Sequence, residues 1–146
     1  MHRLVSPPTG PAGLVIGIDH LSGLNDLART NMLADGIQLG LSTGPEGKQS
    51  GVDIVTGDGR NGYPPCAPYD AIHVGAAAPT LPIALVNQLN SPGRLFIPVG
   101  TYDQDVWQVD KDAQGDVTKK KLFGVRVSAT GPAHVWSAQV IAQLGI

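Results

Sequence analysis

Two aspartates stand directly after short apolar runs, at positions where an acid could bind a ligand. Asp19 closes the run 14–18, and Asp58 lies between two glycines just after the run 52–56. In a parallel sheet flanked by helices, ligands bind beyond the carboxyl ends of the strands. There, Asp19 could accept hydrogen bonds from two ribose hydroxyls, and Asp58 could bind an adenine amino group. Each also has a plainer explanation, because Asp is favoured at helix N-caps and in Asp-Gly turns.

Other side chains that could do chemistry do not assemble into a site. No catalytic triad emerges from His20, His73, Cys66 and Asp70, and the sequence has no Gly-x-Ser-x-Gly elbow. The histidines lack metal-ligand spacing and Cys66 is the single cysteine, so we predict no metal site. His73 lies in an apolar run and is predicted to be a hydrogen-bonded core residue. The basic run 119–121 is predicted to be a solvated hairpin edge.

The elements that would position the two acids alternate between strands and helices. Apolar runs predict buried strands at residues 14–19, 52–56, 69–75 and 94–99. Apolar residues at spacings of three and four, Leu21, Leu24, Ala28 and Met32, predict a helix after the first strand, with Gly36 at its stop. Pro82 is expected to start a second helix, which residues 91–93 end. This alternation predicts an α/β layer fold with a mostly parallel sheet.

The remaining segments predict less regular structure. Residues 36–51 are rich in Gly, Ser and polar residues and are expected to form a surface loop. Residues 105–109 and 121–127 flank a turn-forming stretch and predict an antiparallel hairpin at the sheet edge. A short closing helix is expected from the apolar residues near the C-terminus, which are Trp136, Val140, Ile141 and Leu144.

Composition limits the class of protein. The chain has 146 residues, of which 42% are hydrophobic, and residues 1–146 are expected to form one domain with a real core. Its formal net charge of −2 argues against an electrostatic grip on nucleic acid or on an anionic membrane surface. With one cysteine and no membrane-length apolar run, we expect a cytoplasmic protein. We also expect a monomer.

Several stretches together resemble one family. They are Val-Ile-Gly-Ile-Asp-His at 15–20, Gly-Asp-Gly-Arg at 57–60, the long run at 67–79, and the residues around Gln88-Leu89 and 92–100. These motifs are similar to those of the protein-L-isoaspartate (D-aspartate) O-methyltransferases. The similarity covers most of residues 12–137, apart from the loop at 36–51. It implies a Rossmann-like methyltransferase fold.

The resemblance implies an activity and a cofactor. The family transfers a methyl group from S-adenosyl-L-methionine to the carboxylate of L-isoaspartyl residues in damaged proteins, so the implied partners are isoaspartyl proteins or peptides. Because that carboxylate is ionised at neutral pH, no strong base is required, and no catalytic residue is assigned. Carried over by position, the cofactor-binding residues are Asp19, His20, Asp58, Gly59 and Thr130. The peptide-facing residues are Gly75, Ala76, Ala77 and Ala78.

One family feature is not found in this sequence. The glycine-rich cofactor loop follows a first, central strand, and no Gly-x-Gly-x-x-Gly stands before residue 14. We therefore expect the central strand between residues 14–19 and 69–75 to be missing, and the chain to be a partial methyltransferase domain truncated at its N-terminus. The main alternative is a catalytically inactive α/β binding module. A dehydrogenase would also use an acid after a second strand, but the motif at 69–79 disfavours it.

Overall fold

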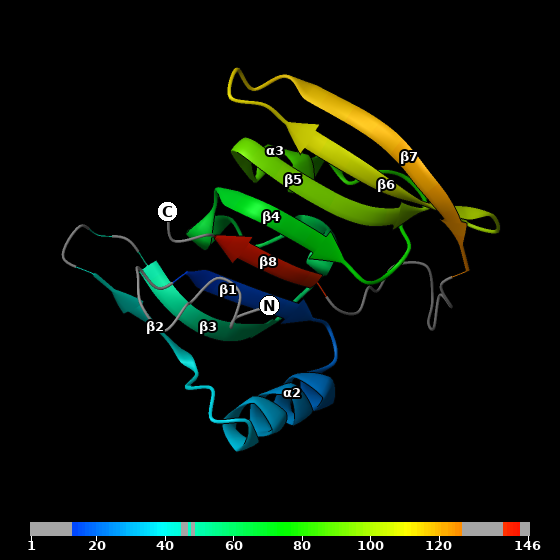
Figure 1. Cartoon of the computed structure of the whole chain (residues 1–146). Coiled ribbons are helices and arrows are strands. Elements are labelled where there is room, and N and C mark those ends of the chain that lie inside the picture. The colour runs from blue at the N-terminus through cyan, green and yellow to red at the C-terminus, as the bar shows by residue number, and fades with distance from the viewer. Residues whose placement is uncertain (1–12, 45–46, 48, 127–138, 144–146) are drawn as a thin grey trace.

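A single mixed sheet organises the chain. The computed structural model describes residues 13–44, 47, 49–126 and 139–143, the last of these by backbone alone. The described residues form eight strands in the order β2-β3-β1-β8-β4-β5-β6-β7 (Figure 1). The strands are β1 (Leu14–Asp19), β2 (Gly40–Thr43), β3 (Gln49–Thr56), β4 (Tyr69–Val74), β5 (Leu89–Val99), β6 (Gln104–Lys111), β7 (Val117–Val125) and β8 (Gln139–Gln143). The helices are α2 (Ser22–Ala34) and α3 (Ile83–Asn87), with 3-10 turns η1 (Gly59–Asn61) and η2 (Pro64–Cys66).

Two strand–helix–strand units form the frame that sequence patterning predicted. Strands β1 and β3 are parallel and joined through α2, and β4 and β5 are parallel and joined through α3. Alternate residues of β1 face opposite sides of the sheet. Leu14, Ile16 and Ile18 belong to the core cluster that includes Leu85 of α3, while Val15 packs with Met32 of α2. The two helices therefore cover opposite faces.

Helix α2 ends as predicted but packs differently. Gly36 has a φ of 75°, and its N–H donates to the carbonyl of Leu33 while the Ile37 N–H donates to that of Met32. This is a Schellman ending, which favours glycine. The predicted apolar face is only partly correct, because Ala28 and Met32 are half-buried whereas Leu21 and Leu24 are 48% and 46% exposed. Asn25 is the buried residue of the helix instead.

Strand β8 occupies the centre of the sheet. It pairs antiparallel with β1 on one side and with β4 on the other, so that Ile141 lies opposite both Ile16 and Ile72. The predicted closing helix is therefore wrong over 139–143. The β-branched pair Val140-Ile141 suits a strand, and so short an apolar run does not distinguish helix from strand by periodicity. Trp136 and Leu144 lie outside the described residues.

The prediction of a mostly parallel sheet is also wrong. Among the described strands only β1·β3 and β4·β5 pair in parallel, and the other five pairings are antiparallel. The hairpin β6–β7 at the sheet edge was expected and is present. The segment 36–51, expected to be a loop, contains β2 and the first residues of β3, which form a second antiparallel pair. Insertion of β8 adds two more antiparallel pairs, and β5 with β6 forms the fifth.

Two element boundaries differ from the sequence prediction. Helix α3 ends at Asn87, and β5 begins at Leu89, so residues 91–93 belong to a strand rather than to a helix end. The register between β4 and β5 shifts there: Tyr69 pairs with Leu89, but Ala71 pairs with Arg94. The extra residues on β5 form a bulge, which accommodates a proline inside a strand. No described helix has the length and apolar content needed to cross a membrane.

Candidate functional site

The carboxyl ends of β1 and β3 lie side by side and carry the two predicted acids. Asp19 is the last residue of β1 and is paired with Thr56, the last residue of β3. The N–H of Gly57 donates to the carbonyl of Asp19 at 3.0 Å, and Asp58 follows directly. Asp19 and Asp58 are 39 positions apart in the sequence. They lie near each other because β1 and β3 are parallel and end at the same edge of the sheet.

Asp19 is nearly buried, with 8% of its surface exposed. Its Oδ1 accepts the N–H of Leu21 at 2.8 Å and lies 3.6 Å from Nδ1 of His20. The carboxylate thus closes a local turn just before α2. Asp19 is not the N-cap of this helix, which was the plainer explanation, because the N-cap residue is Leu21. Asp19 and His20 are therefore held together at the strand end.

Asn25 ties the helix to this edge and was not singled out from the sequence. Its amide donates to the carbonyl of Asp19 at 3.0 Å and to Oγ1 of Thr56 at 2.8 Å. A buried polar side chain needs such partners. The amide therefore bridges the ends of β1 and β3 and fixes the position of the Asp19 backbone. The sequence signal that could have identified Asn25 is a polar residue next to the apolar positions of the predicted helix.

Asp58 is bound by a neighbouring arginine. Its Oδ1 accepts the N–H of Arg60 at 3.0 Å, and Nε of Arg60 lies 2.9 Å from each carboxylate oxygen. Hydrogen bonds from the Arg60 side chain lower the pKa of Asp58, and the nearby charge of His20 lowers it further. Asp58 is also the N-cap of η1, which agrees with the alternative interpretation of these residues as an Asp-Gly turn. Gly59 is buried within that turn. Asp58 and His20 therefore belong to one electrostatic cluster.

Gln88, at the C-terminal end of α3, fastens the loop that follows Asp58. Its side-chain Nε2 donates to the carbonyl of Asn61 at 2.7 Å, and its Oε1 accepts the N–H of Tyr63 at 2.8 Å. Gly62 lies between these two residues with a φ of 62°, and a Cβ there would lie 2.4 Å from the Gln88 amide. The Gln88-Leu89 motif thus has a structural role that sequence reasoning left unassigned.

The predicted peptide-facing segment follows β4 and has two parts. Gly75 is exposed, and Ala76 and Ala77 are half-buried. Ala78 is fully buried: its N–H donates to the carbonyl of Pro98 and its carbonyl accepts the N–H of Gly100. The part open to a ligand is therefore 75–77. Thr130 lies outside the described residues.

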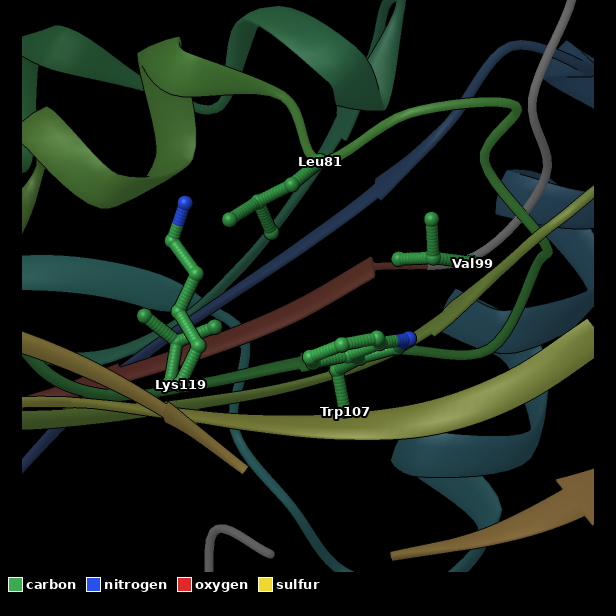
Figure 2. A pocket seen from close by; sticks show the side chains of 5 residues that line it. Leu81, Val99, Trp107 and Lys119 are labelled. Carbon is green, nitrogen blue, oxygen red and sulfur yellow. The ribbon is translucent and has the colours of Figure 1, made fainter. Parts of the chain in front are cut away.

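Other candidate groups lie apart from this edge. His73 is exposed on β4 and is not the core residue that was predicted, because alternation places it opposite the buried Ile72 and Val74. Cys66 is buried, and burial raises the pKa of its thiol, which disfavours the reactive thiolate. The described residues contain no cluster of three or more potential metal ligands. A separate apolar cavity lies between Leu81, which precedes α3, and strands β5–β7 (Figure 2).

Comparison with solved structures defines the class of fold. A protein-L-isoaspartate O-methyltransferase structure matches 82% of this chain with a TM-score of 0.65 at 21% identity. A second structure, of the Plasmodium falciparum protein-L-isoaspartate O-methyltransferase in complex with S-adenosyl-L-homocysteine, matches 76% of this chain and 49% of that one, with a TM-score of 0.59 at 24% identity. The mixed sheet therefore has a methyltransferase-like fold.

Sequence comparison then gives the family. The family model described as protein-L-isoaspartate(D-aspartate) O-methyltransferase matches residues 3–132, and the chain belongs to this family. Protein-L-isoaspartate O-methyltransferase 1 of Arabidopsis thaliana is 43% identical over 117 residues, which cover 80% of this chain and 48% of the plant protein. Protein-L-isoaspartate O-methyltransferase 2 of Archaeoglobus fulgidus is 39% identical over the same shares. The chain thus spans about half the length of the curated relatives it matches.

Proposed function

We propose that this chain carries the adenosine-binding half of an S-adenosylmethionine-dependent protein-L-isoaspartate O-methyltransferase domain. The observation that carries the proposal is the convergence of Asp19 and Asp58 at the carboxyl ends of two adjacent parallel strands, in a chain of this family. Ligands of α/β sheets bind at this edge. Asp19 and His20 would hold the ribose, and Asp58 with Gly59 would lie on the adenine side.

The residues present fit an adenosine group. A nearly buried carboxylate at a strand end can accept hydrogen bonds from vicinal hydroxyls, and charge-assisted bonds are the stronger kind. Arg60 fixes the Asp58 carboxylate, so this acceptor is already oriented before a ligand arrives. Gly57 before it is half-buried and carries no side chain that would keep a flat ligand from the backbone, whereas Gly59 is buried in the turn.

When bound, S-adenosylmethionine supplies a methyl group on a sulfonium, and transfer to a carboxylate oxygen leaves a methyl ester and a neutral thioether. The residues of this chain would bind the adenosine, orient the peptide and exclude water. No residue need accept a proton, because an isoaspartyl carboxylate is already ionised near pH 7. Residues 75–77 are the proposed peptide-facing wall.

A binding module without catalysis is the second candidate, and the position of β8 favours it. Antiparallel β8 lies between β1 and β4, so among the described residues no parallel strand leading into a glycine-rich loop occupies the place between these two strands. Such a loop would bring backbone N–H groups to the methionine end. Since a displacement of about 1 Å can cost on the order of a hundredfold in rate, we expect little methyl transfer by residues 1–146 alone.

Binding and turnover are tested separately. Calorimetric titration with S-adenosylhomocysteine should show binding that Asp19→Asn and Asp58→Asn each weaken by about 1–3 kcal/mol. Asp116→Asn, the same charge change in the exposed β6–β7 turn, is the matched control and should have no effect. Unchanged affinity in both site variants would remove the assignment. A radiolabelled methyl-transfer assay with an isoaspartyl peptide then decides between enzyme and binding module.

A further inference from the structure

A cavity of about 210 Å³ lies on the α3 side of the sheet, away from Asp19 and Asp58. Five residues line it: Leu81 before α3, Val99 at the end of β5, Trp107 and Val109 on β6, and Lys119 on β7. Figure 2 shows Leu81 and Trp107 on opposite sides of the space, with Val99 and Lys119 flanking it. Its walls are aliphatic and aromatic, apart from one ammonium group.

The size of the cavity limits what it can hold. An apolar cavity of about 150 Å³ accepts benzene, so this one has room for a ring and two or three further heavy atoms. The half-buried indole of Trp107 offers a large apolar face to such a group. Leu81 and Val99 contribute aliphatic surface on the other sides. An apolar, ring-sized group therefore fits the space.

None of the other described residues balances the charge of Lys119 at the cavity. Lys121, two residues along β7, pairs with Asp105 at 2.7 Å. Lys119 lies opposite Val109 in the β6–β7 ladder and forms no ion pair within the part of the chain that the structure describes. Its stem lies along the cavity, and its ammonium reaches the level of Leu81 in Figure 2. An ammonium beside an apolar cavity is complementary to a carboxylate.

We propose that this cavity binds a ligand with an apolar, ring-sized group and a carboxylate two or three bonds away. Trp107 receives the apolar group and Lys119 pairs with the carboxylate. The evidence for this site is the cavity and the position of Lys119, and the site does not depend on the proposed methyl transfer.

Two kinds of ligand carry an apolar group and a carboxylate: a small free acid and a peptide. Val99 is bridged to Ala78, which follows the open segment 75–77, so the cavity adjoins the proposed peptide-facing wall. A peptide with an aromatic residue next to an isoaspartate carries both groups, but they are farther apart along the covalent chain than in a small free acid, so the peptide must fold back to place the ring at Trp107 and the carboxylate at Lys119. The peptide source alone rests on the proposed function.

The probe for the cavity itself is 3-phenylpropionate, added to the full chain carrying Trp136→Phe so that Trp107 is the only fluorophore of its kind. We expect saturable quenching of Trp107 fluorescence. The neutral amide of the same acid should bind roughly fivefold more weakly, as expected for loss of one partly exposed ion pair. Equal affinities for acid and amide, or no saturable quenching, would overturn the proposal.

Two adjacent lysines provide a matched pair of variants. Lys119→Met should weaken binding of the acid to the level of the amide, whereas Lys120→Met, on the opposite face of the same exposed strand, should leave it unchanged. Equal effects of the two variants would contradict a site at Lys119. Leu81→Trp fills the cavity from a loop and should abolish binding of both probes, while retained binding would place them elsewhere.

Competition distinguishes the sources. A Phe-isoaspartyl peptide that displaces 3-phenylpropionate, when the matching Ser-isoaspartyl peptide does not, supports the peptide source. Displacement by neither peptide, with the free acid still bound, assigns the cavity to small acids. Because these measurements contain no methyl donor, their outcome is independent of whether the chain has transferase activity.

Discussion

The guanidinium of Arg60 binds both oxygens of the Asp58 carboxylate, with Nε 2.9 Å from each. The two residues are separated by a single glycine, and the backbone N–H of Arg60 donates a further hydrogen bond to Oδ1. The carboxylate is thus fixed in orientation at the edge where β1 and β3 end. Any ligand amino group that reaches Asp58 would share an acceptor whose position the protein has already set.

Replacing Arg60 should raise the pKa of Asp58. Hydrogen bonds from the Arg60 side chain are the main cause of the lowered pKa, so Arg60→Gln should move it back toward its ordinary value. Carboxylate NMR titration measures this directly. Arg94→Gln is the control, because Arg94 in the same way lowers the pKa of Asp110 and not that of Asp58. A pKa of Asp58 that stays unchanged in Arg60→Gln would contradict the pairing.

The same pair gives a small dependence of stability on acid pH. A carboxyl whose pKa is lower in the folded state stabilises the fold above its unfolded pKa, about 3.9, and this contribution is lost as pH falls through the folded value. Both side chains are about one third exposed, so we expect at most about 1 kcal/mol. Urea unfolding between pH 2 and 6 should show this part of the acid loss in the parent chain and not in Arg60→Gln.

Removing the Gln88 amide should destabilise the loop after Asp58. Gln88→Met keeps the side-chain length but removes the partners of the Asn61 carbonyl and the Tyr63 N–H, and because both hydrogen bonds are only partly buried we expect a loss of about 1 kcal/mol for each. Urea unfolding should show this loss. The exposed neighbour substitution Asn87→Met is the control and should change stability by less than about 0.5 kcal/mol. Equal stability of the two variants would show that Gln88 does not hold the loop.

How far the sequence predicts this structure depends on how local the signal is. Strand β1 and the hairpin β6–β7 were predicted because apolar patterning and turn residues act over a few neighbouring positions. Asp19 and Asp58 were singled out because each follows a strand directly. The bonds of Gln88 to Asn61 and Tyr63 were not predictable in this way, since they join residues 25 to 27 positions apart.

The central place of β8 is a non-local result of the same kind. Residues 140 and 141 are apolar in any conformation, and only the two strand edges of β1 and β4 select a strand over the predicted helix. His73 was wrongly predicted to be buried, because an apolar run favours a strand that is covered on both faces. In the structure His73 is exposed on β4, while Ile72 and Val74 on the other face are buried. Which face is covered is a property of packing and not of the run itself.

Tyr69 should make the fold sensitive to alkaline pH. Its ring is fully buried and its hydroxyl donates to the carbonyl of Tyr63 at 2.6 Å, and burial raises the pKa of the phenol. An acid with a raised folded pKa stays protonated in the fold while the unfolded chain ionises, so stability should fall as pH rises above about 10. Tyr69→Phe should lose about 1 kcal/mol at neutral pH and lack this alkaline decline. Spectrophotometric titration with thermal unfolding checks both effects, and an equally steep alkaline decline in Tyr69→Phe would exclude Tyr69 as its source.

A proline in β8 should disrupt the sheet at its centre. Ile141 is paired on both sides, with Ile16 of β1 and Ile72 of β4, and a proline there removes a backbone donor and fits poorly in an interior strand. Ile141→Pro should cost about 3 kcal/mol or more, a large part of the roughly 5–15 kcal/mol that holds a typical domain together. The control is Ala113→Pro at the second position of the β6–β7 turn, where proline is favoured. Thermal unfolding should show a lower midpoint for Ile141→Pro alone, and amide hydrogen exchange in β1 and β4 should become faster. If exchange in those strands and the midpoint both match the parent chain, β8 does not join the two halves of the sheet in solution.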